Sequence, residues 1–125
     1  MNYLLDTHVV LWWFTDPTQI ASKAAKIIAD KDNPVLISCV SLWEMSIKKS
    51  LGRLTLPRNI LEVIHIVGFK ILAIGPEEAL GICDLPHIHH DPFDRMLVMQ
   101  AKLHDLILIT RDANIMKYPV ITVKA

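Results

Sequence analysis

Residues 91–112 read DPFDRMLVMQAKLHDLILITRD, and this stretch contains a helix start, a helix and a strand in succession. Asp91 precedes a proline, which is the arrangement of an N-cap acid and a first helical residue. We therefore predict a helix from Pro92 to about His104. The next apolar run, Leu106–Ile109, is unbroken and predicts a strand. A helix that leads into an apolar strand indicates an α/β fold.

The same alternation of short apolar runs and helical patterns extends along the whole chain. We expect strands at residues 2–5, 35–38, 69–74, 106–109 and 120–123. We expect helices at residues 7–14, 20–30, 42–51, 60–67, 76–82 and 92–104. Strands that alternate with helices form βαβ units around a mostly parallel sheet. The chain has 125 residues and shows no linker or repeat, so we expect one α/β domain over residues 1–125.

The composition is that of an ordered domain, with 52% apolar and 21% charged residues. Lys and Arg (13) balance Asp and Glu (13), so a nucleic-acid role would need a local basic patch. Cys39 and Cys83 are expected to be buried free thiols, because they form no C-x-x-C pair. The sequence shows no signal peptide and no membrane-spanning run, which predicts a cytoplasmic protein.

Four acids fall where predicted strands end or where the following helices begin. They are Asp6, Glu44, Asp94 and Asp112. In open α/β sheets, ligands bind outside the carboxyl ends of the strands, so we expect these side chains to converge there. Carboxylates held close together repel one another unless a positive charge lies among them. Ligands that are all oxygen select Mg²⁺ or Mn²⁺. Such an ion lowers the pKa of a bound water so that it attacks phosphorus, which implies phosphodiester hydrolysis.

A different interpretation of the same acids is helix capping. Ser41 and Glu44 have the spacing of a capping box, in which Glu44 would bond back to the backbone N–H of Ser41. Asp91 and Asp94 suit the N-cap and first turn of a helix, and Asp6 could cap the helix that follows it. The two interpretations are compatible, because a capping carboxylate can present a free oxygen to a metal.

Three histidines near the predicted 92–104 helix raise the alternative of a zinc site. They are His87, His89 and His90. The tract has no cysteine partner and no evident fourth ligand, so a loop role is favoured over zinc. In that role one histidine contacts the substrate or orients Asp91 or Asp94. His8, His65 and His104 have the pattern of ordinary surface or edge positions.

Basic residues gather on and just beyond the predicted helix at 42–51. They are Lys48, Lys49, Arg53 and Arg58. Lys48 lies four residues after Glu44, which favours a salt bridge within the helix. The alternative role for the cluster is phosphate contact, and Arg95 and Arg111 adjoin two of the acids and could act in the same way. Trp12, Trp13 and Trp43 are expected in the core or at a subunit interface.

Four segments in this order resemble PIN-domain ribonucleases of the VapC toxin type. They are LLDTH (4–8), SLWEMSIKKSLGRL (41–54), HHDPFDRMLVMQA (89–101) and LITRD (108–112). The resemblance implies a three-layer α/β/α domain that gathers acids around Mg²⁺ or Mn²⁺ and cleaves RNA. Carried over by motif, the acidic quartet is Asp6, Glu44, Asp94 and Asp112.

The resemblance has further implications for individual residues and for partners. Asp91 takes the role of a helix cap, with a secondary or water-mediated role at the metal. Thr7 and Thr110 are expected to hold water molecules there. The family also implies a homodimer and a cognate antitoxin protein whose C-terminal segment enters the active-site groove.

Three functions therefore follow from the sequence. The first is a metal-dependent endoribonuclease that uses a metal-activated water, acting as the toxin of a toxin–antitoxin pair. The second is a non-catalytic binding module whose acidic pocket grips a basic peptide. The third is a metal-dependent phosphatase, which is suggested by Asp6-Thr7 after the first strand.

Overall fold

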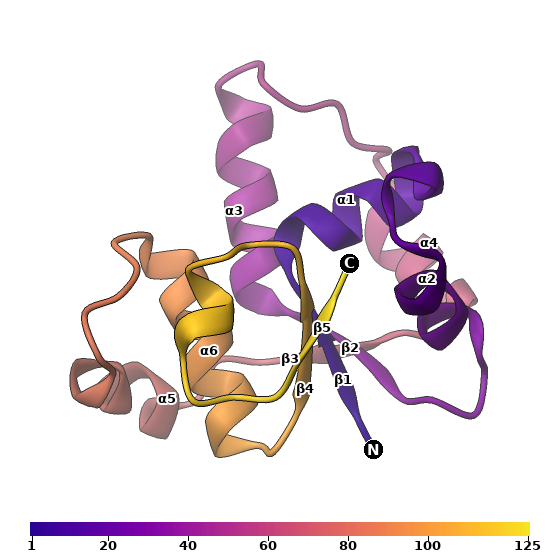
Figure 1. Cartoon of the computed structure of the whole chain (residues 1–125). Coiled ribbons are helices and arrows are strands. Elements are labelled where there is room, and N and C mark those ends of the chain that lie inside the picture. Colours follow the sequence, from indigo (N-terminus) through magenta and orange to yellow (C-terminus); the bar gives the residue numbers. More distant parts are fainter.

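Five short strands form one sheet in the order β3-β2-β1-β4-β5 (Figure 1). The computed structural model describes residues 1–125. The strands are β1 (Tyr3–Leu5), β2 (Val35–Ser38), β3 (Lys70–Leu72), β4 (Ile107–Thr110) and β5 (Thr122–Lys124). All of the pairings between neighbouring strands are parallel, so the carboxyl ends of the strands share one edge of the sheet.

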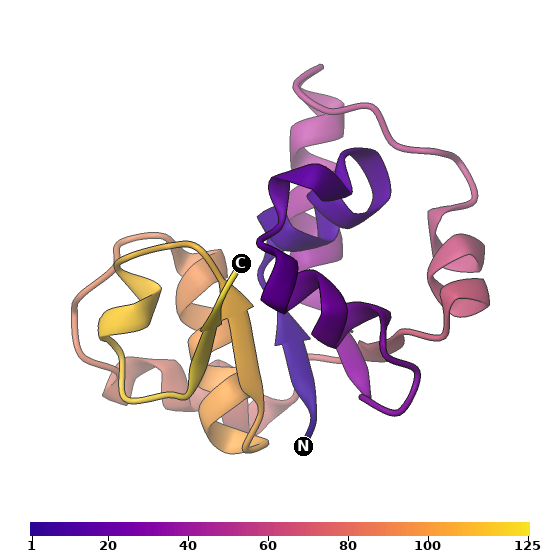
Figure 2. The ribbon, with the colours of Figure 1, turned by 45° about the vertical axis from the view of Figure 1, so that its right-hand side comes forward.

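Helices cover both faces of this sheet. They are α1 (Thr7–Thr15), α2 (Ser22–Ala29), α3 (Cys39–Ser50), α4 (Ile60–Val67), α5 (Pro76–Gly81) and α6 (Pro92–Leu103). Short 3-10 helices lie at η1 (Pro17–Gln19), η2 (Ile82–Asp84) and η3 (Ile115–Lys117). Figure 2 shows α1 and α2 (indigo) on the opposite side of the sheet from α6 (orange). The predicted three-layer α/β/α fold is confirmed, and the expected segments are present with ends shifted by a few residues.

Each face of the central strands contributes to its own hydrophobic core. Leu5 and Ile109 pack in a cluster with residues of α1, α2 and α4, such as Val10. Leu4 and Leu108, one residue earlier in each strand, pack in a second cluster with residues of α6. This alternation is the two-residue periodicity of strands that are buried on both faces.

Helix α3 begins three residues earlier than the sequence predicts. Ser38 is its N-cap, and the Ser38 Oγ accepts a 3.0 Å hydrogen bond from the backbone N–H of Val40. The predicted capping box at Ser41 and Glu44 is therefore wrong. Ser41 instead lies buried inside the helix, where its Oγ accepts a 2.9 Å hydrogen bond from the Thr7 hydroxyl. Glu44 lies beyond the first turn of α3, and its side chain does not cap the helix.

The expectation that both cysteines are buried needs correction. Cys83 is exposed in η2, where its Sγ–H donates to the carbonyl of Leu80 at 3.2 Å, and Cys39 is half-buried. Trp43 is 60% exposed and contacts Phe93 of α6 edge to face, with ring centroids 5.1 Å apart. None of the helices combines the length and the apolarity that a membrane crossing demands.

Candidate active site

The carboxyl ends of β1 and β4 place Asp6 and Asp112 close together. Leu5 pairs with Ile109, and the backbone N–H of Asp6 donates to the carbonyl of Ile109 at 3.0 Å. The Thr110 hydroxyl donates to Oδ2 of Asp6 at 2.7 Å and accepts from the backbone N–H of Asp112 at 3.0 Å. One buried hydroxyl therefore connects both acids. Asp6 is positioned as the N-cap of α1, but its side chain makes no capping bond.

The N-terminus of α6 assigns different roles to its two aspartates, as the sequence predicts. Asp91 is the N-cap, and its Oδ1 accepts from the backbone N–H of Phe93 at 2.8 Å and of Asp94 at 3.3 Å. Asp94 lies in the first turn and is only 14% exposed in its side chain. The capping function is therefore met by Asp91, and the Asp94 carboxylate is available to the acidic cluster.

Helix α3 contributes the fourth acid. Glu44 is buried, and its Oε2 lies 3.4 Å from the Lys48 Nζ one turn later. The predicted salt bridge between these two residues is thus present. The expected cap at Asp91 and the expected acids at Asp6, Glu44, Asp94 and Asp112 all lie at this edge of the sheet.

His89 lies between two of the acids. Its Nε2 is 2.9 Å from Oδ2 of Asp112 and 3.0 Å from Oδ2 of Asp94. Candidate ligand atoms of these three residues lie within 4.8 Å of one another. His87 and His90 are exposed and are not part of this group. The structure therefore does not assemble a zinc site from the three histidines.

The pKa values show that negative charge is crowded at this site. Burial, together with the charges of Asp6 and Asp91, raises the pKa of Asp94 to about 7, although His89 opposes the shift. Burial also raises the pKa of Asp6, which the hydrogen bond from Thr110 only partly offsets. A carboxyl with a raised pKa is one whose charged form lacks sufficient positive compensation.

Asp112 and His89 shift in the directions that a mutual hydrogen bond favours. Burial acts to raise the pKa of Asp112, but the hydrogen bond from His89 and the backbone N–H groups of Asn114 and Ile115 bring it below its ordinary value. Burial acts to lower the pKa of His89, but the hydrogen bond to Asp112 and the charge of Asp94 raise it overall. Both shifts favour a charge-assisted hydrogen bond from the Nε2–H of His89 to the ionised Asp112 carboxylate.

Unpartnered buried oxygens provide a test of whether a divalent cation fits here. Oδ1 of Asp6 and Oε1 of Glu44 are buried and have no hydrogen-bond partner. A buried polar atom without a partner costs about 1–3 kcal/mol, so such atoms are rare unless a ligand satisfies them. Unpartnered carboxylate oxygens suit a hard cation such as Mg²⁺ or Mn²⁺. The residues present therefore fit the ion that the sequence predicts.

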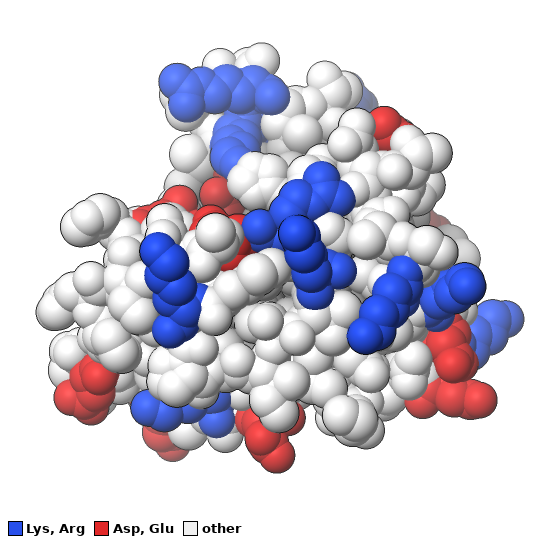
Figure 3. Space-filling model, in the orientation of Figure 1, with Lys and Arg blue, Asp and Glu red and all other residues white.

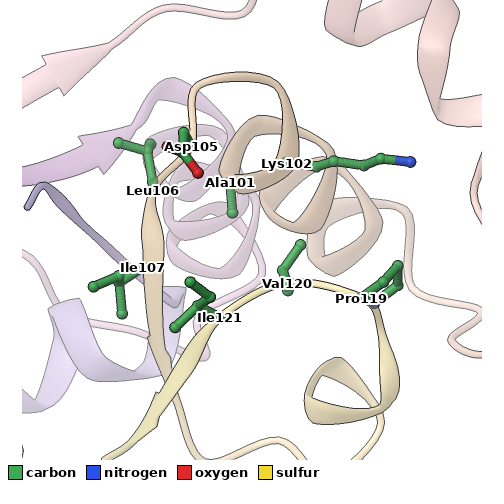
Figure 4. Close-up of a pocket in the computed structure, with 8 residues that line it drawn as sticks. All are labelled: Ala101, Lys102, Asp105, Leu106, Ile107, Pro119, Val120 and Ile121. Carbon is green, nitrogen blue, oxygen red and sulfur yellow. The ribbon is translucent and has the colours of Figure 1, made fainter.

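A hollow of about 270 Å³ opens beside the acids. It is lined by Asp6, His8, Trp12, Arg111 and Asp112. Figure 3 shows acidic atoms in a recess of the surface, with basic side chains above and beside them. A smaller hollow of about 130 Å³ lies between the end of α6 and the segment before β5, lined mainly by apolar side chains (Figure 4). It gathers no group of acids.

The two arginines next to the acids are held differently. The Arg111 guanidinium lies over the Trp12 ring, 4.4 Å from its centroid, and donates to the carbonyls of Ala125 and Gln19. It lines the same hollow as Asp6 and Asp112. Arg95 instead donates to the carbonyls of Pro86 and Ile82 and to the Tyr118 hydroxyl. Its guanidinium thus anchors the loop before α6.

The sequence predicts that one of the three histidines contacts the substrate or orients Asp91 or Asp94, but it does not single out His89, and it does not predict the contact between Thr7 and Ser41. The histidine was one of three in a loop, and no local pattern distinguishes the one whose ring turns towards the acids. Thr7 and Thr110, which were expected to hold water molecules, donate their hydroxyls to Ser41 and Asp6. The Thr7 contact is buried and links α1 to α3.

The fold and site define an α/β protein with an acidic, cation-compatible centre at the carboxyl edge of a parallel sheet. The family model described as the PIN domain matches residues 3–120. The chain therefore belongs to the PIN-domain family.

Individual relatives agree with this assignment. Ribonuclease VapC22 of Mycobacterium tuberculosis is 26% identical over 115 residues, which cover 90% of this chain and 88% of that protein. VapBC2 of Rickettsia felis, in a crystal structure with a promoter DNA fragment, matches with a TM-score of 0.73 and 16% identity, covering 99% of this chain and 98% of that chain. A toxin–antitoxin complex from Klebsiella pneumoniae matches with a TM-score of 0.63 and 22% identity, covering 97% and 95% of the two chains. The structural matches show the shared fold.

Proposed function

We propose that this chain is a metal-dependent endoribonuclease and the toxin of a toxin–antitoxin pair. The observation that carries the proposal is the acidic cluster itself, in which two buried oxygens lack partners and one carboxyl has a pKa of about 7. Membership of the PIN-domain family and the relative named as a ribonuclease support RNA as the substrate.

Asp6, Glu44, Asp94 and Asp112 are proposed to hold Mg²⁺ or Mn²⁺. A bound ion of this kind polarises a phosphoryl oxygen and lowers the pKa of a water that attacks phosphorus. The protein supplies the charge and the orientation. Thr110 fixes Oδ2 of Asp6, so that the unpartnered Oδ1 is the oxygen left for the ion. The role proposed for Asp91 is to hold the first turn of α6 and thereby the backbone of Asp94.

RNA contacts are proposed for the basic residues that surround the acids. Lys49 and Arg53 are exposed at the end of α3, and Lys48 sits beside Glu44. Arg111 lines the hollow that also contains Asp6 and Asp112, so it can meet a phosphate close to the acids. Neutralising phosphates with such side chains gives binding that weakens as salt rises.

The proposed partners follow from the structural relatives. The complex from Klebsiella pneumoniae is described as a toxin–antitoxin complex, and the matching Rickettsia felis and Salmonella typhimurium structures are of VapBC bound to DNA. We propose by analogy that a cognate antitoxin protein binds this chain and covers its acidic groove. A homodimer and a cytoplasmic location belong to the same proposal.

Induction of the chain in a bacterial host tests this function. Expression of the wild-type chain without an antitoxin is expected to arrest growth and to produce new RNA ends that sequencing can map. The Asp94→Asn variant should do neither at the same protein level, and His90→Ala serves as a matched control that should behave as wild type. Growth arrest by Asp94→Asn, or arrest by the wild type without new RNA ends, would contradict the proposal.

A further inference from the structure

His89 is outside the acidic quartet, yet its ring reaches two of the four acids and the backbone of the α6 N-cap. Its ring nitrogen Nε2 meets Oδ2 of both Asp94 and Asp112, while Nδ1 lies 3.1 Å from the backbone nitrogen of Asp91. Each of these interactions reaches a residue of the α6 start or of the segment after β4. Coordination of a metal ion by His89 would not by itself account for these three contacts of the ring.

The hydrogen bonds of His89 fix which ring nitrogen carries the proton. The backbone N–H of Asp91 can only donate, so Nδ1 must accept and cannot carry a hydrogen. The ring proton therefore lies on Nε2, which is 2.9 Å from Oδ2 of the ionised Asp112 carboxylate and 3.0 Å from Oδ2 of Asp94. A nitrogen that carries a proton has no lone pair for a metal, so this ring is a donor to the acids rather than a ligand.

The position of the ring is fixed from the backbone side as well. The backbone N–H groups of Ile88 and His89 donate to the Tyr118 hydroxyl at 3.3 and 2.9 Å. Tyr118 is buried, and Arg95 donates to the same hydroxyl at 3.2 Å. The His89 side chain is only 16% exposed. These hydrogen bonds restrain the loop, and they thereby fix the position of the His89 ring between Asp94 and Asp112.

We propose that His89 is a positioning residue that fixes Oδ2 of Asp112 by the hydrogen bond from its Nε2–H, lies 3.0 Å from Oδ2 of Asp94, and so prepares the cation site. The proposal rests on the proposed metal-dependent function. Without the His89 ring between them, two ionised carboxylates close to each other would repel and separate. With it, the second oxygen of Asp94 is left to join the unpartnered oxygens of Asp6 and Glu44.

Cation affinity tests this role without relying on catalysis. Mn²⁺ binding to the purified full chain is measured by calorimetry for the wild type and for His89→Ala, His89→Gln and His90→Ala. Residues that orient metal ligands typically contribute a factor of roughly 10 to 100 in affinity, so His89→Ala should bind Mn²⁺ that much more weakly. His89→Gln retains a side-chain N–H donor and should recover part of the affinity. His90→Ala, which changes the exposed neighbour, should match the wild type.

The ring itself provides the second measurement. Nitrogen-15 NMR of the histidine side chains, with and without saturating Mg²⁺, distinguishes a protonated from an unprotonated ring nitrogen. The proposal expects Nε2 of His89 to remain protonated and Nδ1 unprotonated in both states. A switch to unprotonated Nε2 on adding Mg²⁺ would make His89 a direct ligand and overturn the positioning role.

Other outcomes separate this inference from the function on which it rests. If the wild type binds Mn²⁺ and cuts RNA while His89→Ala binds Mn²⁺ equally well or more tightly, the positioning role alone is wrong. In the case of tighter binding, His89 would be a competitor for the cation. If the wild type binds no divalent cation, both the inference and the metal-dependent function are wrong. Thermal unfolding of each variant confirms that the compared proteins are folded.

Discussion

The Thr110 hydroxyl donates a 2.7 Å hydrogen bond to Oδ2 of Asp6, although the two residues are 104 positions apart in the chain. Parallel pairing of β1 with β4 brings them together, because Asp6 and Thr110 follow the paired residues Leu5 and Ile109. The same hydroxyl accepts from the backbone N–H of Asp112. The Thr110 side chain is placed by the parallel pairing of β1 with β4, and it in turn positions two proposed ligands, Asp6 and Asp112.

Replacing Thr110 with valine should damage both stability and cation binding. Valine fills the same space but removes the donor to a buried carboxylate, which costs about 1–3 kcal/mol in the free energy of unfolding. Loss of the group that orients Asp6 should also weaken Mn²⁺ binding by roughly 10- to 100-fold. Chemical denaturation and calorimetry measure the two effects. Thr110→Ser keeps the hydroxyl and should stay near wild type; equal behaviour of the valine and serine variants would contradict this role.

Asp94→Asn should stabilise the cation-free protein above neutral pH. Folding raises the pKa of Asp94 from 3.8 to about 7, mainly by burial, so its ionised form is disfavoured in the folded state. The stability that its protonation contributes is complete below the unfolded pKa and is lost as pH rises through about 7. Asparagine never ionises and avoids this loss.

The thermal unfolding of both proteins, measured in EDTA, checks this prediction. The advantage of Asp94→Asn should be a few kcal/mol or less at pH 8, and it should shrink at pH 5.5, where the wild-type carboxyl is largely protonated. A variant that is less stable than wild type at pH 8, or a difference that does not change with pH, would contradict the raised pKa.

Cation affinity should increase with pH across the neutral range. Below about pH 7 the Asp94 carboxyl holds a proton that a cation must displace, so the affinity should fall by up to about tenfold for each pH unit below this value. Above pH 8 the dependence should level off. Mn²⁺ titrations at pH 6, 7 and 8 measure this trend, and equal affinities at the three values would show that Asp94 is already ionised at pH 6.

Removing basic side chains at the end of α3 should weaken RNA binding. Each phosphate that the protein no longer neutralises reduces the slope of log affinity against log salt by about one, or slightly less for a single strand. Lys49→Ala with Arg53→Ala, both exposed positions, should therefore bind a short RNA more weakly and with a smaller salt dependence. Fluorescence anisotropy in the Asp94→Asn background measures binding without cleavage.

A lysine at the opposite edge of the sheet provides the control for this comparison. Lys70 is exposed at the amino end of β3, whereas the proposed site lies beyond the carboxyl ends of the strands. Lys70→Ala should leave both the affinity and its salt dependence unchanged. Equally weakened binding in the two sets of variants would indicate a general effect of net charge rather than a binding surface.

The parts of the fold that local physical chemistry determines were predictable from the sequence. Apolar runs such as Ile107–Ile109 form buried strands, and Asp91-Pro92 starts a helix because an N-cap acid and a proline suit the first turn. The position of Asp6 and Asp112 after parallel strands was sufficient to predict that they meet. This prediction needs only the rule that ligands bind at the carboxyl edge of a parallel sheet.

Features that depend on competition between neighbouring side chains could not be predicted in this way. Ser38 and Ser41 are both residue types that suit an N-cap. Ser38 takes this position because β2 ends at Ser38 and α3 follows directly. Arg95 is adjacent to Asp94, but carbonyls and a hydroxyl from distant segments draw its guanidinium away to the loop. His89 differs from His87 and His90 only in how the folded loop turns its ring.

Cleavage of RNA by the purified, antitoxin-free chain tests the central claim most directly. A labelled single-stranded RNA is incubated with wild type or Asp94→Asn in Mg²⁺, in Mn²⁺ or in EDTA, and the products are resolved on a gel. The proposed function predicts internal cleavage by wild type with either ion, none in EDTA, and a rate at least about 100-fold lower for Asp94→Asn, since even residues that only orient ligands contribute up to that factor. Undiminished cleavage in EDTA or by Asp94→Asn would contradict it.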